Sequence, residues 1–578
     1  MSYVCALSQE KILSIASESI NIEELKEMLY IYSSDEFGGR GTPSKGQDLA
    51  IEFLIDRYKK IGVNPLQKDN YRQEVKLQFD FKPIVNLSVN GTSFKYYDDF
   101  ISHNNGPKVK YNSEDIIFVG FGIDDPSYSD YKKLNVKGKV VVALEGEPRN
   151  ANGNFFINGE KKSVWSNNRE ELRNKKAAAK NNGAKTLILL NDYLYNRYRY
   201  DFESADKGIG EKRMSLQDDS QDGPHLFLFP TRFNNFFSDD NLKLDLDFEP
   251  NSEPFTADNV AAYIKGEEFP NEYIILTAHL DHVGIQNGEI YNGADDDGSG
   301  SMALLELAEA FKEAKKNGDG TKRSIVLLHV TGEEKGLLGS KYYTDEDPIY
   351  PLENTVVNLN VDMIGRIDPT REAKNRDYVY LIGSDHDSQD LHDISEKSNL
   401  ESVNMTLDYR FNDKNDPNRF YYRSDHYNFA KNGIPIIFYF SGTHEDYHQP
   451  TDTPDKIDYD ILEMRTKLIF HTAWNIANRE ERLVLDEKPE EANDTYKHTL
   501  EEIKSFGGIY KTEAFPLQFK FYEAYGKLNM VPLGGSNEEA LILEGNGKNK
   551  FKSEMAGVSL EFKIDVTKSR TEVKNVSS

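Results

Sequence analysis

The chain is poor in cysteine: Cys5 is the single cysteine among 578 residues. One cysteine cannot form an intrachain disulfide, and it excludes the cysteine-based zinc sites that hold many small domains together. Any metal ion bound here must therefore be held by histidine and carboxylate side chains.

Long apolar runs are also missing. No segment approaches the roughly 20 apolar residues that a membrane-spanning helix needs. The first residues, MSYVCALSQEKILSIA, lack the basic stretch followed by an apolar stretch that marks a secretion signal. The sequence is compatible with a cytoplasmic protein or with a chain whose signal segment is absent, and of the two we expect an exported protein (periplasmic, cell-surface or secreted).

Basic residues are outnumbered: 70 Lys and Arg stand against 97 Asp and Glu, a formal net charge of −27. A nucleic-acid-binding protein would concentrate Lys and Arg on one face, and no such cluster stands out. The sequence therefore predicts no nucleic-acid partner, and the negative charge favours solubility.

Hydrophobic residues (38%) and aromatic residues (12%) are sufficient for real cores, and the length suggests two to four domains. Residues 44–62 have apolar side chains at helical spacing and end in a glycine, which predicts a helix. Between 258 and 480, apolar strand candidates such as YIILTA and SIVLLHVT alternate with helical segments such as SMALLELAEAFKEA. This alternation predicts an α/β fold whose mixed, mostly parallel sheet is flanked by helices.

Two further regions differ in pattern from this one. Residues 88–252 read as an inserted α+β module, and the chain after 490 alternates polar and apolar residues, as an antiparallel β module does. We therefore predict four parts. They are an N-terminal part of the main domain (1–87), the inserted domain (88–252), the main domain (253–485) and a C-terminal β-rich module (486–578).

Polar side chains follow the strand candidates of the main domain at the points where they end. His279 and Asp281 follow YIILTA, and Glu333 and Glu334 follow SIVLLHVTG. Likewise, Asp362 ends VVNLNV, His448 lies beyond IPIIFYF, and an acidic run, ADDDG, stands between a strand and a helix. Because functional groups gather at the carboxyl ends of strands in such sheets, these side chains should meet in one cleft. Cations must neutralise that much negative charge, and mixed histidine and carboxylate ligands suit zinc.

Local spacing gives two of these residues a role. Alternate residues of an extended segment point the same way, so the Asp281 carboxylate can accept the second ring N–H of His279. Neighbours Glu333 and Glu334 must point differently, so that one can bind metal while the other acts as the general base of a hydrolysis.

Five segments, in order, resemble the motifs of M28 peptidases: TAHLDHVG, NGADDDGSGSMALLELA, TGEEKGLLGSKYY, NVDMIG and DYHQPTDTPDK. The resemblance implies two zinc ions bridged by Asp295, with His279 and Asp362 completing one site and Glu334 and His448 the other. It also implies that Glu333 is the general base and that the Asp295–Asp296 peptide bond is cis.

Two side chains near the last histidine are candidates for stabilising the oxyanion. Tyr447 matches a tyrosine that does this in some members of the family, and Arg423 is a second candidate whose alternative role is an ion pair with Asp425. The family pattern spans about 20–62 and 256–480, and the insert at 88–252 resembles a protease-associated (PA) domain. The resemblance does not reach 490–578.

Two other motifs compete for the same residues. His444–His448 fits H-E-x-x-H, but that motif requires a helix, and Pro450 and Pro454 argue against one. The spacing from Asp295 to Glu306 approaches an EF-hand loop, but a strand and not a helix precedes it. For the remaining nearby histidines we expect local hydrogen bonds only: His282, His426 and His444.

The favoured function is a zinc-dependent exopeptidase, most simply an aminopeptidase acting on peptides. A carboxypeptidase of the glutamate carboxypeptidase type stays open, because Arg410, Arg419 and Arg423 could bind an acidic C-terminal residue. Glutaminyl cyclase chemistry uses one zinc, which the five-ligand set disfavours. A non-catalytic binding protein like the transferrin receptor would have lost ligands, and none is missing. The sequence has no G-x-S-x-G motif and no phosphate-binding G-K-[ST] loop.

Overall fold

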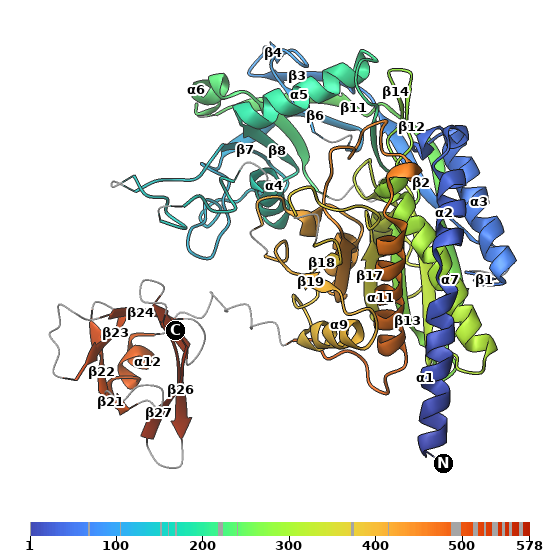
Figure 1. The fold of residues 1–578 in the computed structure, drawn as a ribbon. Helices are drawn as coiled ribbons and strands as arrows, with labels where there is room; N and C mark the ends of the chain where they lie inside the picture. The colour runs from blue at the N-terminus through green and yellow to red at the C-terminus, as the bar shows by residue number, and fades with distance from the viewer. Residues whose placement is uncertain are drawn as a thin grey trace.

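A computed structural model of the chain describes residues 2–66, 70–103, 106–150, 153–159, 161–167, 170–217, 223–239, 241–371, 375–413, 416–486, 499–511, 518–524, 527–533, 541–545, 550–553, 558–565 and 570–577. Its strands form three large sheets, and the first of them contains the predicted α/β domain (Figure 1).

The first sheet has ten strands in the order β19-β18-β20-β17-β13-β16-β12-β2-β9, with β1 paired beside β12. Its four central strands are parallel: β16 (Arg323–Val330), β13 (Phe269–His279), β17 (Thr355–Val361) and β20 (Ile436–Phe440). The strands toward the edges are β19 (Thr406–Asp408), β18 (Tyr378–Ile382), β12 (Ser252–Ile264), β2 (Arg72–Asp80), β9 (Arg213–Leu216) and β1 (Asn64–Pro65). The prediction of a mixed, mostly parallel sheet is confirmed.

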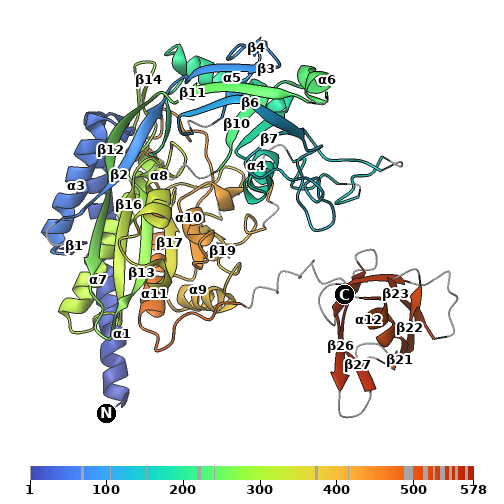
Figure 2. The same cartoon turned by 180° about the vertical axis from the view of Figure 1, so that it is seen from behind.

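Both faces of this sheet are covered, as its continuous apolar strands require. Ile274 and Leu276 of β13 pack into the main core, whereas Tyr273 and Ile275 pack into a second core on the other face. The main core also contains α1 (Ser2–Ser19), α2 (Ile22–Tyr32), α3 (Lys45–Ile61), α7 (Gly300–Lys316) and α11 (Tyr459–Ala477), with α9 (Gln389–Glu401) against α11. The short helices α8 (Leu338–Lys341) and α10 (His426–Ala430) lie together near the second core (Figure 2).

Helix α3 shows how the sequence sets the ends of these helices. The Ser44 hydroxyl accepts the Gln47 N–H at 3.1 Å and caps the first turn. Gly62 ends the helix with φ 79°, in the left-handed conformation that glycine adopts without strain. The predicted helix at 44–62 is confirmed, with Leu54 and Tyr58 buried against the sheet.

The second sheet has eight strands in the order β4-β3-β11-β6-β7-β8-β10-β5, with helices α4, α5 and α6 in the same region. The bounds are β3 (Ile84–Val89), β4 (Thr92–Phe94), β5 (Ile101–Ser102), β6 (Val109–Phe118), β7 (Val140–Leu144), α4 (Glu171–Asn181), β8 (Thr186–Leu190), α5 (Asp192–Asp206), β10 (His225–Phe229), α6 (Asn234–Phe237) and β11 (Lys243–Glu249). This separate α+β unit agrees with the predicted insert. One strand of the segment, β9, joins the first sheet instead, by pairing with β2. The four domain boundaries given above stay predictions.

The third sheet is the predicted C-terminal β module. Seven antiparallel strands follow one another in sequence order, beside the short helix α12 (Leu500–Ser505). Their bounds are β21 (Gly508–Lys511), β22 (Gln518–Ala524), β23 (Lys527–Pro532), β24 (Leu541–Gly545), β25 (Lys550–Ser553), β26 (Val558–Asp565) and β27 (Arg570–Ser577). A small hairpin of β14 (Gly284–Gln286) and β15 (Glu289–Tyr291) stands apart from all three sheets. Within the described residues, no helix is long and apolar enough to cross a membrane.

Glu306, in the middle of α7, makes the stability of the main domain depend on pH. Burial, followed by the nearby carboxylates of Glu24 and Glu309, raises its pKa to about 8, although the Asn21 N–H donates to it at 3.0 Å. Between the unfolded pKa, roughly 4.3, and this value, the native state binds more protons than the unfolded state. This contribution therefore lowers stability as the pH rises through that interval.

We expect Glu306→Gln to be more stable than the wild type at alkaline pH, because glutamine keeps the acceptor for Asn21 and carries no charge to bury. Its advantage should grow by roughly 1–3 kcal/mol between pH 5.5 and 8.5, measured by denaturant unfolding. Glu313→Gln on the same helix is the control, because a hydrogen bond from Lys316 lowers the pKa of Glu313. An equal pH-dependent gain in both variants would contradict the assignment.

Candidate metal centre

The carboxyl ends of the central strands bring the predicted side chains together. β13 ends at His279, and β16 and β17 lead into Glu334 and Asp362. The chain beyond β20 returns as a turn that places His448 beside them. Two groups of side chains result, each suited to a metal ion: His279 with Asp296 and Asp362, and His282 with Asp296 and Glu334.

In the first group, His279 Nε2 lies 3.2 Å from Asp296 Oδ1 and 3.6 Å from Asp362 Oδ1. The other ring nitrogen of His279, Nδ1, lies 3.0 Å from the main-chain oxygen of Asp281. Nδ1 can therefore donate its proton to that oxygen, which orients Nε2 toward the carboxylates.

In the second group, the other oxygen of the same aspartate takes part. Asp296 Oδ2 lies 3.0 Å from His448 Nε2 and 3.8 Å from His282 Nδ1. Glu334 lies between the two histidines, with Oε2 at 3.2 Å from His448 Nε2 and Oε1 at 2.9 Å from His282 Nδ1. Asp296 thus faces both groups, one carboxylate oxygen to each.

The shared position belongs to Asp296 and not to Asp295, the residue expected from the sequence. The expected cis peptide was also wrong by one residue, because the cis bond joins Asp296 to Asp297. Three consecutive aspartates follow the strand, and sequence spacing alone could not distinguish which of them points into the cleft.

Asp295 instead supports the loop from behind. Its Oδ1 accepts the Gly365 N–H at 2.6 Å, and its Oδ2 lies 3.2 Å from His444 Nε2. The Asp452 carboxylate accepts the backbone N–H groups of Asp295 and Asp296. The loop that carries the shared aspartate is therefore fixed by backbone donors on one side and by a buried histidine on the other.

The role predicted for the Asp281 carboxylate also changes. It was expected to accept the ring N–H of His279, but the Asp281 main-chain oxygen contacts that ring. The carboxylate accepts the Glu333 N–H at 3.1 Å instead. Asp281 is fully buried and so positions both the first histidine and the segment that carries the two glutamates.

Asp362 is oriented by a chain of buried side chains. Its Oδ2 accepts the Ser424 hydroxyl at 2.7 Å, which leaves Oδ1 for the cleft. Asn360 donates to the same hydroxyl at 2.9 Å, and Thr277 donates to Asn360 at 2.6 Å. These contacts tie β13, β17 and the segment before α10 into one rigid support.

Among the described residues, Asp296 Oδ2, Glu334 Oε1 and both ring nitrogens of His282 are buried and make no hydrogen bond of regular geometry, although histidine nitrogens and carboxylate oxygens lie close to one another here. Buried polar atoms that are poorly paired are costly, and a cation within reach would satisfy them. Burial lowers the pKa of His448, but the Asp296 and Glu334 carboxylates outweigh it and raise that pKa to about 10. Positive charge between Asp296 and Glu334 therefore stabilises the cleft, and the mixed nitrogen and oxygen donors of the two groups fit zinc.

Glu333 lies in the same small pocket, of about 30 Å³, but is in neither group. Burial, together with the neighbouring Glu334, raises its pKa well above the usual range, although His279 opposes this. Its neighbour Glu334 points to His282 and His448, so the two glutamates diverge as the sequence analysis expected.

Tyr447 and Arg423 line the same pocket. Arg423 Nη2 donates to Tyr447 Oη at 3.1 Å, and the Tyr447 ring stacks on His448 with ring centroids 4.0 Å apart. Burial raises the pKa of Tyr447 well above its usual range, so the hydroxyl stays protonated. The alternative partner of Arg423, Asp425, accepts the Ser340 hydroxyl instead.

The structure contains neither the helical H-E-x-x-H motif at 444–448 nor an EF-hand loop at 295–306. Residues 444–448 form turns and not a helix, and His444 and His448 contact different aspartates. Glu306, the last position of the EF-hand spacing, is buried in α7 and accepts the Asn21 N–H. His282 was expected to make only local hydrogen bonds, and its place in the second group is the contact that sequence reasoning missed. Its position three residues after His279 was the available signal.

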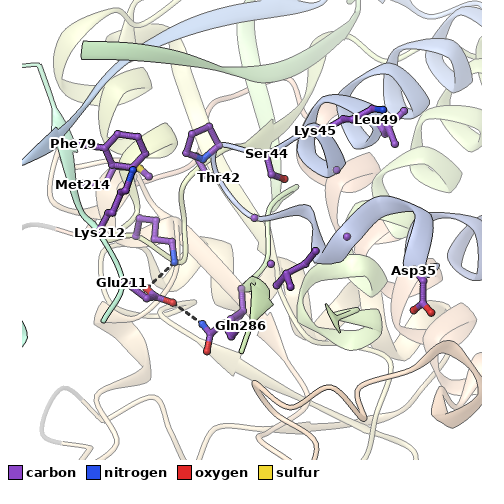
Figure 3. A pocket seen from close by; sticks show the side chains of 18 of the residues that line it. Asp35, Thr42, Ser44, Lys45, Leu49, Phe79, Glu211, Lys212, Met214 and Gln286 are labelled. Carbon is purple, nitrogen blue, oxygen red and sulfur yellow. Dashed lines mark hydrogen bonds and ion pairs between the residues drawn. The ribbon is translucent and has the colours of Figure 1, made fainter. Parts of the chain in front are cut away.

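A larger cavity, of about 780 Å³, does not coincide with this centre (Figure 3). It is lined by the segment around Thr42 and Lys45, by β2 and β9, and by the β14 hairpin. Lys335 and Gln286 both contact Glu211 at its wall, at 2.8 and 2.6 Å. None of the side chains in the two metal-binding groups lines this cavity.

The chain is similar in sequence to known metallopeptidases. Residues 259–473 match the sequence pattern of Peptidase family M28. A probable zinc metalloprotease of Pyrenophora teres f. teres is 26% identical over 52% of this chain and 69% of the relative. Aminopeptidase YwaD of Bacillus subtilis is 25% identical over 39% of this chain and 46% of the relative, so the match spans about half of that protein. A probable leucine aminopeptidase 2 of Aspergillus oryzae is 25% identical over 73% of this chain and 72% of the relative.

A parallel sheet that gathers histidines and carboxylates at its carboxyl edge, with one aspartate shared between two groups, is the arrangement of a metal-dependent hydrolase. The matched segment contains all of these side chains. The segment 259–473 therefore belongs to peptidase family M28.

Measurements of zinc affinity can test whether Asp296, and not Asp295, is the metal ligand. We expect Asp296→Asn to weaken zinc binding by more than about 100-fold, because the substitution removes a charged donor from both groups. Asp295→Asn is the matched control and should cost no more than about tenfold, since asparagine retains one acceptor for Gly365. Equilibrium competition with a chromogenic chelator measures both. The opposite order would restore the ligand set expected from sequence.

Proposed function

We propose that the protein is an exopeptidase that removes N-terminal residues from peptides with two zinc ions bound at this centre. The observation that carries the proposal is that the two oxygens of Asp296 face two separate groups of histidine and carboxylate side chains.

His279, Asp296 and Asp362 would hold one ion, and Asp296, Glu334, His448 and His282 the other. The donor atoms of the second group lie 2.9 to 3.8 Å apart along the contacts described above. Tetrahedral zinc separates neighbouring donors by about 3.3 Å, given bonds of about 2.0–2.1 Å to nitrogen and oxygen. When bound, such ions polarise the scissile carbonyl and lower the pKa of water.

Glu333 is the general base in this proposal. It lines the pocket with His279 and Asp362 without belonging to either metal group, and the Asp281 carboxylate fixes its backbone. It would take the proton of the attacking water and pass it to the leaving amine.

Tyr447 is the donor that would stabilise the oxyanion formed at the scissile carbonyl. Its hydroxyl remains protonated, and the guanidinium of Arg423, which donates to the same oxygen, strengthens it as a hydrogen-bond donor. Arg423 therefore acts on the reaction through Tyr447.

Two observations favour cleavage at the N-terminal end. The pocket beside the metal groups is partly apolar, with Met363, Phe420, Phe438 and Phe440 among its walls, which favours an apolar side chain next to the scissile bond. Two of the relatives reported above are named aminopeptidases, one of them a leucine aminopeptidase.

Two of the three arginines that kept a carboxypeptidase open, Arg410 and Arg419, already lie against carboxylates of the protein. Arg410 binds the Asp408 carboxylate through two nitrogens, at distances of 2.8 to 3.1 Å. Arg419 lies 3.6 Å from Glu170. An arginine that binds a carboxylate of the protein is less able to bind the carboxylate of a substrate, so these contacts disfavour the carboxypeptidase alternative.

Cleavage by the wild type and by Glu333→Gln tests the proposed reaction. The wild type should hydrolyse aminoacyl reporters with a free N-terminus and leave the N-acetylated reporters intact. Glu333→Gln should lower kcat by two to four orders of magnitude, the usual contribution of a general base, while retaining its zinc. Elemental analysis of the same preparations supplies the control for metal content. Cleavage of N-blocked peptides from the C-terminus would favour the carboxypeptidase, and full activity of Glu333→Gln would exclude Glu333 as the base.

The number of ions and the part played by His282 can be tested together. The wild type should hold two zinc ions per chain after dialysis against zinc-free buffer. His282→Ala should hold one, because the second group loses a buried donor. His444→Ala is the matched control: it removes a buried histidine that contacts Asp295, and it should retain both ions. Two ions retained by His282→Ala would show that His282 is no ligand.

A further inference from the structure

A second large cavity, of about 730 Å³, opens beside the metal centre and is lined by four cationic side chains: Arg173, Lys176, Arg197 and Arg423. We call it the basic cleft. Arg173 and Lys176 come from α4, Arg197 from α5 and Arg423 from the segment before α10. None of the described residues that line it is Asp or Glu.

This lining is unusual for a chain with a formal charge of −27. A concave surface with charge of one sign concentrates the electric field and attracts ligands of the opposite sign. Glu170 lies 3.6 Å from both Arg173 and Arg419, so one carboxylate is shared between a guanidinium group of the cleft lining and a neighbouring arginine.

The basic cleft and the small pocket of the reaction centre share one side chain of their walls. Arg423 lines both the cleft and the small pocket that contains His279 and Glu333. From there its guanidinium reaches Tyr447, whose ring stacks on His448. The two spaces therefore adjoin each other at Arg423.

The sizes of the two cavities indicate which part of a peptide each one takes. The pocket at the metal groups, about 30 Å³, is far too small for an extended peptide, so only the end of a chain can approach the metal groups there. The basic cleft, about 730 Å³, lies in the range of cavities that enclose ligands of several hundred daltons. The residues that follow the scissile bond would lie in the cleft, against the rings of Tyr193 and Tyr198 and within reach of Arg197.

We propose that the basic cleft binds the peptide segment that follows the scissile bond and selects acidic side chains there. This inference rests on the proposed exopeptidase function and adds a substrate class to it: peptides with Asp or Glu after the N-terminal residue.

Three peptides of equal length test the selection. Each begins with Leu, and the next three residues are Glu, Gln or Lys. We expect kcat/KM to fall in the order Glu, Gln, Lys, by about two- to fivefold for each Glu replaced by Gln at low ionic strength. The ratio between the Glu and Gln peptides should shrink in 0.5 M salt, because screening weakens exposed ion pairs.

The double variant Arg173→Ala/Arg197→Ala should lose most of the preference for Glu over Gln. Lys180→Ala/Lys207→Ala is the matched control, because it removes the same charge from the ends of α4 and α5 outside the cleft lining. The control should keep the wild-type preference.

A reporter consisting of one amino acid and a neutral leaving group separates the two proposals, since it places nothing in the cleft. Hydrolysis of the reporter with equal kcat/KM for the Glu and Gln peptides would overturn the cleft assignment alone. An unchanged preference in Arg173→Ala/Arg197→Ala would do the same. Failure to hydrolyse the reporter and all three peptides would overturn the exopeptidase proposal itself, and the selection with it.

Discussion

The burial of several carboxylates at one edge of a parallel sheet is the constraint on which the rest of the structure depends. The central strands β16, β13, β17 and β20 run in the same direction, so whatever follows their carboxyl ends must share one cleft. Here that means Asp296, Glu334 and Asp362, all held away from bulk water. Buried negative charge of this density is stable only when cations and oriented donors compensate it. The histidines that lie against these carboxylates meet part of that requirement.

The loop of three aspartates shows how neighbouring residues of one type come to do different work. Asp296 faces both groups of the cleft, while Asp295 supports the loop through Gly365 and His444. Asp297 accepts the backbone N–H groups of His279, Gly300 and Met363, and so ties β13, α7 and the end of β17 together. Two of the three carboxylates thus hold the third in place by satisfying backbone donors.

The inserted α+β unit carries charge of the opposite sign toward the same site. Helices α4 and α5 contribute Arg173, Lys176 and Arg197 to a cavity that reaches Arg423, whereas the sheet edge itself is acidic. In the proposed function, the α/β domain holds the metal ions, and the inserted α+β unit contacts the rest of the peptide. An acidic cleft suited to cations lies next to a basic cleft suited to anions, and each field is strongest where low-dielectric walls enclose it.

Three features could be predicted from the sequence, because each depends on local periodicity or on a neighbouring strand. They are the alternation of strands and helices in the main domain, the glycine that ends α3, and the positions at strand ends of His279, Glu333, Glu334, Asp362 and His448. Sequence spacing could not choose between Asp295 and Asp296, since adjacent residues of an irregular loop have no fixed direction. It also missed His282, and it assigned the ring contact of His279 to the wrong oxygen of Asp281. The basic cleft joins segments more than 200 residues apart in the sequence. The tertiary structure decided these points, because they depend on the orientation of side chains that only long-range packing fixes.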